Sequence, residues 1–136
     1  MKRMQTRTLQ SYAPPLLLMG AIFILSSIPG KLADDHALKF VTELDPQLQN
    51  LLHIPVFGLL QWLWLRAFAK TEKTGGRALL ACGGITAAYG VFDECHQLFV
   101  PGRYASLTDV LLNLVGVAAG TLAFRWISPS CTEWST

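Results

Sequence analysis

The chain has 136 residues, of which 51% are hydrophobic and only 15% charged, and its mean hydropathy is +0.37. Soluble domains carry roughly 25% charged residues, so this composition favours a single membrane domain over a water-soluble one and excludes a disordered protein. The formal net charge of +2 is too small for a nucleic-acid-binding surface, so we expect no nucleic-acid partner.

Four stretches without charged residues predict four membrane-spanning helices. Their lengths are 23 residues (8–30), 20 residues (46–65), 15 residues (78–92) and 15 residues (110–124). A helix rises about 1.5 Å per residue, so crossing a roughly 30 Å hydrocarbon layer takes about 20 residues. We predict one domain over residues 1–136, an all-α polytopic membrane bundle with helices at about 12–28, 51–69, 78–96 and 108–127.

The first predicted helix has no polar face between residues 16 and 25. A buried helix of a soluble bundle would keep a polar side, so a soluble bundle is disfavoured. The basic residues before this helix resemble the start of a signal peptide, but no candidate cleavage site has small residues at both required positions. We therefore expect a retained helix, closed by Pro29 and Gly30.

The connections between the helices are also patterned. Residues 32–50 fit either a short amphipathic helix on the membrane surface or an irregular loop. Residues 74–76 predict a tight connection between the second and third helices, and Pro101-Gly102 predicts a turn between the third and fourth.

The distribution of basic residues predicts the orientation in the inner (cytoplasmic) membrane. With both termini in the cytoplasm, the inner side holds eight basic residues: Lys2, Arg3, Arg7, Arg66, Lys70, Lys73, Arg77 and Arg125. The outer side then holds three, which are Lys31, Lys39 and Arg103. Because positive residues are retained on the cytoplasmic side, we expect a multi-pass protein with both termini inside.

The polar residues are expected to converge at one end of the bundle, because alternating helices bring the ends of the first and third to the starts of the second and fourth. The set is Ser26, Ser27, His53, Asp93, Glu94, His96, Gln97, Asp109 and Asn113, with Arg103 in the last connection. The third and fourth windows are about five residues too short to span, so their acids should lie beneath the headgroups, where an ionisable residue costs roughly 2.5–3.5 kcal/mol or less.

Helical spacing predicts the neighbours of these acids. Asp93 should lie near His96 and Gln97, and Glu94 should lie near Gln97, since residues three and four apart share a face. A salt bridge to Arg103 is the simplest structural role for the two acids.

The fourth helix carries two further patterns. Ser106 and Asp109 fit a capping box at its start, which leaves a second role for Asp109 open. Gly116 and Gly120 should let this helix approach the second or third helix closely.

The three cysteines, Cys82, Cys95 and Cys131, are expected at different depths. A disulfide needs Cα atoms within about 7 Å, so we predict free thiols, with Cys82 packed inside the bundle.

Residues 89–116 resemble the signature of the VanZ-like family. The shared pattern is Asp-Glu-x-His-Gln from Asp93, then Pro-Gly-Arg from Pro101, then Ser-x-x-Asp-x-x-x-Asn-x-x-Gly from Ser106. His53 and Phe57 match an earlier His-x-x-x-aromatic element. The resemblance implies a small polytopic membrane protein of the bacterial cell envelope. It also implies a link to resistance against the glycopeptide antibiotic teicoplanin, with which the founding member is associated.

Three functions remain open on these residues. In the first, the polar site binds the headgroup of a membrane lipid or a lipid-linked envelope intermediate, with Arg103 pairing a phosphate. The other candidate binding residues are His96, Gln97, Ser106, Asp109 and Asn113. In the second, an integral-membrane enzyme acts on a lipid-linked substrate, with Asp93 or Glu94 as general base and His53 or His96 as acid. In the third, buried ion pairs only stabilise the bundle.

No cofactor is assigned from the sequence. A metal variant of the enzyme would use His53, Asp93, Glu94, His96 and Asp109 as ligands. The chain has no His-x-x-x-His pair, so we predict no metal site.

Overall fold

The computed structural model describes residues 2–29, 50–71 and 75–127, and the side chains from residue 10 onward. These residues form four α-helices and no strand. The helices are α1 (Lys2–Ser26), α4 (His53–Lys70), α5 (Gly76–Gln97) and α6 (Leu107–Ile127). The prediction of an all-α chain is therefore confirmed for the described residues.

Three of the predicted helices agree with the structure to within two residues at each end. The first differs, because α1 begins at Lys2 rather than near residue 12. The hydrophobic window marks only the part of a helix that can enter a membrane. Polar residues such as Lys, Arg and Gln favour helix and extend it beyond that window.

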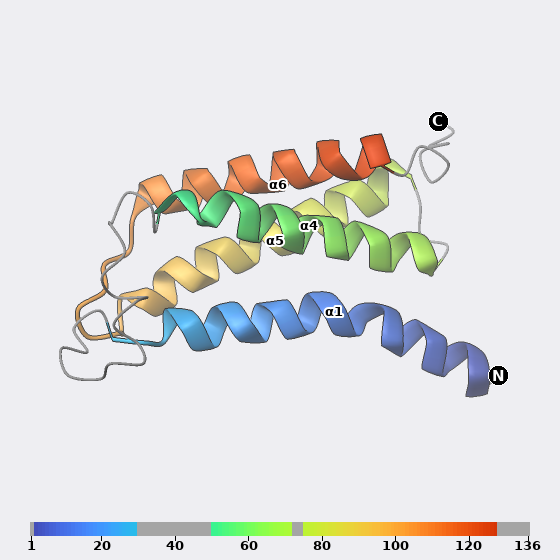
Figure 1. The fold of residues 1–136 in the computed structure, drawn as a ribbon, viewed down its shortest axis with the longest axis horizontal. Coiled ribbons are helices and arrows are strands. Elements are labelled where there is room, and N and C mark those ends of the chain that lie inside the picture. The colour runs from blue at the N-terminus through green and yellow to red at the C-terminus, as the bar shows by residue number, and fades with distance from the viewer. Residues whose placement is uncertain (1, 30–49, 72–74, 128–136) are drawn as a thin grey trace.

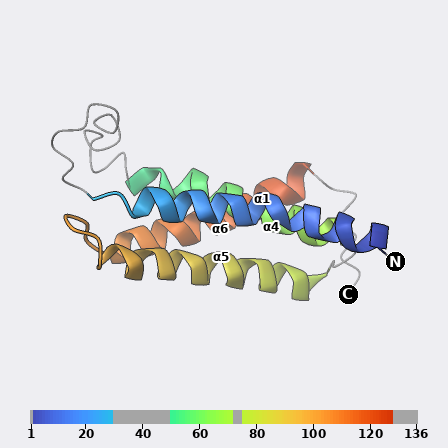
Figure 2. The ribbon, with the colours of Figure 1, turned by 90° about the horizontal axis from the view of Figure 1, so that it is seen from below.

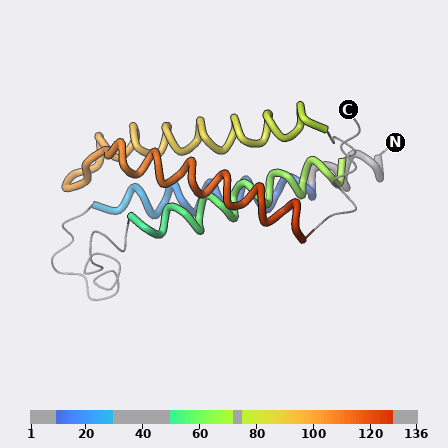
Figure 3. The backbone as a smooth tube through the Cα atoms, turned by 90° about the horizontal axis from the view of Figure 1, so that it is seen from above, coloured from blue at the N-terminus to red at the C-terminus, as the bar shows by residue number. Residues whose placement is uncertain are grey.

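The four helices run antiparallel, so their ends collect into two groups. Figure 1 shows the start of α1 and the end of α6 at one end of the bundle. At the other end, α1 and α5 end where α4 and α6 begin, and we call this the polar end (Ser26, His53, Gln97 and Leu107). Figure 2 and Figure 3 show that α5 runs along one side of the other helices.

The closest approach in the bundle is between α4 and α6, and it depends on glycine. A Cβ atom placed on Gly116 would lie 2.6 Å from the carbonyl oxygen of Ile54, and one on Gly120 would collide with the carbonyl oxygen of Gly58. Small residues let helix backbones approach closely, which is the function predicted for this pair. The structure confirms close packing and identifies the second helix, α4, as its partner.

The core and the outer surface are both apolar. The buried cluster contains Phe57, Leu60, Leu65, Cys82 and Phe124. The outer surface exposes Leu17, Leu80 and Leu122 at 74%, 76% and 66%, a degree of apolar exposure that is unusual for a soluble monomer.

By length and composition, α6 (Leu107–Ile127) is the one helix in the described part of the chain that could cross a membrane. Gln10–Ser26 is apolar but shorter. The arrangement of four membrane-spanning helices therefore stays a prediction.

The two short connections contain glycines with positive φ, a conformation that favours this residue. Gly102 has φ 76° in the connection before α6, as expected for the Pro101-Gly102 turn, and Gly75 has φ 102° directly before α5. Residues 32–49 and Thr74 lie outside the described residues, and so does Cys131. Cys82 and Cys95 are free thiols, Cys82 buried and Cys95 exposed.

Candidate functional site

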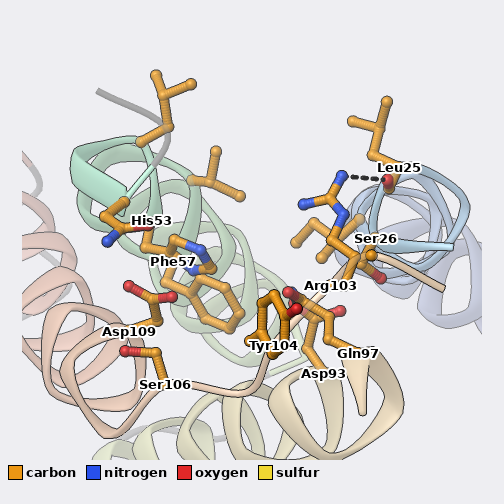
Figure 4. Close-up of a pocket in the computed structure, with 15 residues that line it drawn as sticks. Leu25, Ser26, His53, Phe57, Asp93, Gln97, Arg103, Tyr104, Ser106 and Asp109 are labelled. Atoms are coloured by element: carbon orange, nitrogen blue, oxygen red, sulfur yellow. Dashed lines mark hydrogen bonds between the residues drawn. The ribbon is translucent and has the colours of Figure 1, made fainter. Parts of the chain in front are cut away.

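A cavity of about 520 Å³ opens at the polar end between α1, α4, α5 and the start of α6. Its apolar wall comes from α1 and α4 and includes Ile22, Leu25, Val56 and Phe57. Its polar lining consists of Ser26, Asn50, His53, Asp93, Gln97, Arg103, Tyr104, Ser106 and Asp109. In Figure 4, His53, Ser106 and Asp109 lie on one side, and Asp93, Gln97 and Arg103 on the other. The cavity is thus amphipathic.

Three of the predicted residues form a compact cluster on the first of these sides. One ligand-capable atom each from His53, Glu94 and Asp109 lies within 4.8 Å of the other two. The three residues come from α4, α5 and α6, so only tertiary packing brings them together. Glu94 is 3% exposed and Asp109 is 7% exposed. We call this group the His53 cluster.

His53 is held by a neighbour on α6. Its Nδ1 lies 2.9 Å from Oδ1 of Asn113, which is 1% exposed. An amide oxygen only accepts hydrogen bonds, so Nδ1 is the donor, and Nε2 is not used by this bond. Asn113 does not line the cavity, in contrast to its expected role as a headgroup ligand, because it lies one turn deeper on α6 than Asp109.

Glu94 is held at one oxygen only. The backbone amide of Ser106 donates to Oε2 of Glu94 at 3.0 Å, while Oε1 is buried without a hydrogen-bond partner. Oδ1 of Asp109 is also buried and unpartnered. This bond identifies Ser106, directly before α6, as the hydrogen-bond partner of Glu94 and gives it a role beyond the predicted cap.

Asp93 lies at the opposite wall of the cavity. Its Oδ2 accepts a hydrogen bond from Nε2 of Gln97 at 3.2 Å, as the four-residue spacing predicts. Its Oδ1 has no partner, although the residue is 1% exposed. Asp93 therefore adds a third buried carboxylate oxygen without a partner, at the wall opposite the His53 cluster.

Arg103 forms no salt bridge with the acids of the described region, which corrects the expected structural role. Its Nε donates to the carbonyl oxygen of Ile28 at 3.1 Å and its Nη2 to that of Leu25 at 3.4 Å. The carbonyls at a helix C-terminus lack intrahelical partners and carry partial negative charge. Arg103 thus caps the end of α1 while it lines the cavity (Figure 4).

His96 contacts the end of α1, and no hydrogen bond joins it to Asp93, the expected partner on α5. Its Nε2 lies 2.9 Å from Oγ of Ser27, and its ring stacks on Phe23 with centroids 4.5 Å apart. His96 does not line the cavity. The i, i+3 spacing permits an Asp93 contact, but the ring packs on the aromatic surface of α1 instead.

Three polar features were not predicted. Asn50 and Tyr104 line the cavity from the connections, where sequence spacing carries no directional information. Halfway along the bundle, Gln61 joins Thr86 and Thr121 in a buried network. The sequence contained an indication of this network: Gln61 is a polar amide inside the charge-free window of 46–65, where a side chain needs a hydrogen-bond partner.

The chemistry available at the site follows from these atoms. Three carboxylate oxygens, on Asp93, Glu94 and Asp109, have no hydrogen-bond partner, and Nδ2 of Asn113 is a buried donor without one. Arg103 contributes positive charge, and Gln97 an amide, at the opposite wall. The His53 cluster supplies one imidazole nitrogen and two carboxylates, a set that can hold a cation or exchange protons.

A model of the VanZ/LLP1 family matches residues 7–128, which is most of the chain and includes every residue of the site. Neither a curated protein nor a solved structure matches the chain. The match covers α4, α5 and α6 completely and α1 from Arg7 onward. On this match, the chain belongs to the VanZ/LLP1 family.

Proposed function

We propose that this VanZ-like protein binds the headgroup of a lipid or glycolipid in the cavity at its polar end. Family membership and the apolar α6 indicate a membrane protein. The observation that carries the proposal is the amphipathic lining of the cavity, with apolar side chains from α1 and α4 beside buried polar groups from α5 and α6. A lipid presents the same two chemistries at the membrane interface.

The lining favours a headgroup that combines a phosphate with hydroxyl or amine donors. Arg103 uses Nε and Nη2 to cap α1, and the remaining N–H groups of its guanidinium can bind a phosphate oxygen. The unpartnered oxygen of Asp93 accepts a hydroxyl or amine donor at the same wall. A headgroup with phosphate alone would leave the carboxylates without donors.

The proposed orientation places the cavity at the outer face of the inner membrane. The starts of α1 and α5 and the ends of α4 and α6 lie away from the polar end, and the basic residues of that side outnumber those of the polar end. Reporter fusions after Val100 and at the C-terminus should report opposite sides of the membrane. Both fusions on the same side would contradict this topology.

The direct test is the lipid that remains on the protein after gentle extraction. Native mass spectrometry of the full chain should show one retained lipid. Val56→Phe should reduce that retention at least tenfold, because Val56 lines the cavity and a phenyl ring would fill part of it. The matched control is Val91→Phe on α5, since Val91 is 48% exposed and lies outside the cavity.

Equal lipid retention by both variants would contradict the proposal, and so would an unliganded wild-type protein in all phospholipid mixtures tested. The expected link to glycopeptide resistance would follow from altered presentation of envelope lipids. Expression of the wild-type chain should then raise the teicoplanin concentration needed to inhibit growth, and Val56→Phe should abolish that increase.

A further inference from the structure

We propose that the His53 cluster is a binding site for a divalent metal ion, with Zn²⁺ as the best chemical match. The three ligands would be a ring nitrogen of His53 and one carboxylate oxygen each of Glu94 and Asp109. This site goes beyond headgroup binding, because it requires no lipid and is measured without one.

The arrangement of the donor atoms already approaches a metal site. The three atoms lie within 4.8 Å of one another. Zinc binds His nitrogen and carboxylate oxygen at about 2.0–2.2 Å, so two ligands of one tetrahedral ion lie roughly 3.4 Å apart. A contraction on the order of 1 Å, within the reach of side-chain torsions, would complete the site.

The cluster also contains two acids that have no basic partner in the described part of the chain, and it has unused ligand atoms. Oε1 of Glu94 and Oδ1 of Asp109 are buried and have no hydrogen-bond partner. No lysine or arginine within residues 50–71 and 75–127 forms an ion pair with either carboxylate, and Arg103 is bonded to the end of α1. Buried carboxylates normally bind a partner or a metal, since desolvation of an isolated charge is costly. A cation between the two carboxyl groups would balance their charge and bind the unpartnered oxygens.

The surrounding contacts orient the ligands as outer-shell partners do in metal sites. Metal-binding histidines almost always donate their second ring N–H to an oxygen, which fixes the tautomer. Nδ1 of His53 donates to Asn113 in this way, so Nε2 is the nitrogen free to bind a cation. The amide of Ser106 holds one oxygen of Glu94 and leaves the other unpartnered.

The composition of the cluster selects among metals. One imidazole with two carboxylates suits Zn²⁺, whereas Mg²⁺ and Ca²⁺ prefer oxygen alone. His53 and Asp109 line the cavity, whereas Glu94 does not. A fourth position of the ion would therefore face the cavity, where a phosphate oxygen or water could bind it. Asp93 and His96 are outside this group of donor atoms, and their hydrogen bonds go to Gln97 and Ser27.

The test is metal binding by the full chain in detergent. Cys95→Ser and Cys131→Ser form the common background, so that exposed or tail thiols do not bind zinc. After removal of metal with EDTA, the protein is titrated with Zn²⁺ against a chromogenic chelator, and retained metal is measured by elemental analysis. We expect about one Zn²⁺ per chain with Kd below ~10 µM, and a rise in Tm on addition of Zn²⁺.

The variants form matched pairs. Glu94→Gln, Asp109→Asn and His53→Gln should each weaken Zn²⁺ binding at least tenfold, and Asn113→Leu should weaken it by about 10–100-fold through His53. Asp93→Asn and His96→Gln should keep the wild-type affinity, because they change the same residue types outside the cluster.

Three results would overturn the metal site: no saturable Zn²⁺ binding by the wild-type chain, unchanged affinity in the cluster variants, or equal losses in the two controls. If a cluster variant does not fold, the wild-type titration and the Tm shift on Zn²⁺ addition still test whether the metal site exists. Zinc binding and headgroup binding are tested separately. Lipid retention is measured by native mass spectrometry on both the EDTA-treated and the zinc-loaded protein, so either proposal can fail without the other.

Discussion

The bundle contains two sets of buried polar residues. They differ in whether they contain ionisable side chains and in whether their polar atoms have hydrogen-bond partners. In the middle, Oε1 of Gln61 accepts from Thr86 at 2.8 Å and its Nε2 donates to Thr121 at 3.1 Å. Thr86 also lies 2.9 Å from the carbonyl oxygen of Cys82. This network is neutral, and no buried side-chain atom of Gln61 or Thr86 lacks a hydrogen-bond partner. The His53 cluster at the polar end contains an imidazole and two carboxyl groups, and two of its carboxyl oxygens have no partner.

This difference suggests that the Gln61 network stabilises the fold and that the His53 cluster binds a ligand. A neutral network whose polar atoms have hydrogen-bond partners fixes the positions of the helices and does not require a ligand. Unpartnered buried oxygens raise the free energy of the folded state unless a ligand binds them. We therefore expect mutations in the Gln61 network to change stability, and mutations in the His53 cluster to change ligand binding. The following variants test that division, from the largest expected effect to the smallest.

Gly120→Val should disrupt both groups at once, because the glycine crossing of α4 and α6 lies between them along each helix. The new side chain would collide with the backbone of Gly58. Forced separation of the two helices should cost about 3 kcal/mol or more in the free energy of unfolding. Denaturation in SDS–detergent mixtures measures the loss.

The control is Gly84→Ala on α5. A Cβ on Gly84 would meet no atom within 4 Å, and alanine favours helix over glycine. This variant should be as stable as wild type or more stable. A stable Gly120→Val protein would show that α4 and α6 can pack at a greater distance.

Gln61→Leu should lower the free energy of unfolding by about 1–2 kcal/mol, because two interhelical hydrogen bonds are lost in an apolar environment. Lipid retention and Zn²⁺ affinity should stay at wild-type values. The same denaturation experiment and the two binding assays provide the measurements. A loss of binding larger than the loss of stability would place Gln61 in the functional site.

Glu94→Gln should have the opposite profile when measured in EDTA. An amide keeps an acceptor for the Ser106 N–H and removes a buried charge, so the free energy of unfolding should rise by about 1 kcal/mol. A decrease of similar size would mean that the charge of Glu94 stabilises the bundle. The His53 cluster would then serve structure as the Gln61 network does.

Ser27→Ala should have the smallest effect. The hydroxyl bonds His96 at 2.9 Å, but both residues are partly exposed and water can replace the contact. We expect a change below about 0.5 kcal/mol in stability and none in binding. A large effect would mean that the Ser27–His96 hydrogen bond also contributes to the stability of the bundle or to binding.

Much of this arrangement followed from local sequence. The charge-free windows located the helices, and alternating helices placed the polar residues at one end. The spacing of Asp93 and Gln97 predicted their hydrogen bond. The partners of Glu94 and Arg103 were not predictable in this way, because they lie on other elements. Spacing along one helix says which residues share a face, but not what that face contacts.

The sequence by itself determined four helical segments, a glycine pair suited to close packing and a concentration of acids near two helix ends. Tertiary structure decided which atoms meet. The approach of Gly58 to Gly116 and Gly120 sets the position of α6 against α4, and that position brings Asp109 and Asn113 to His53. The physical reason is that each helix can rotate about its own axis without changing its sequence pattern. Only contact between the backbones selects one rotation.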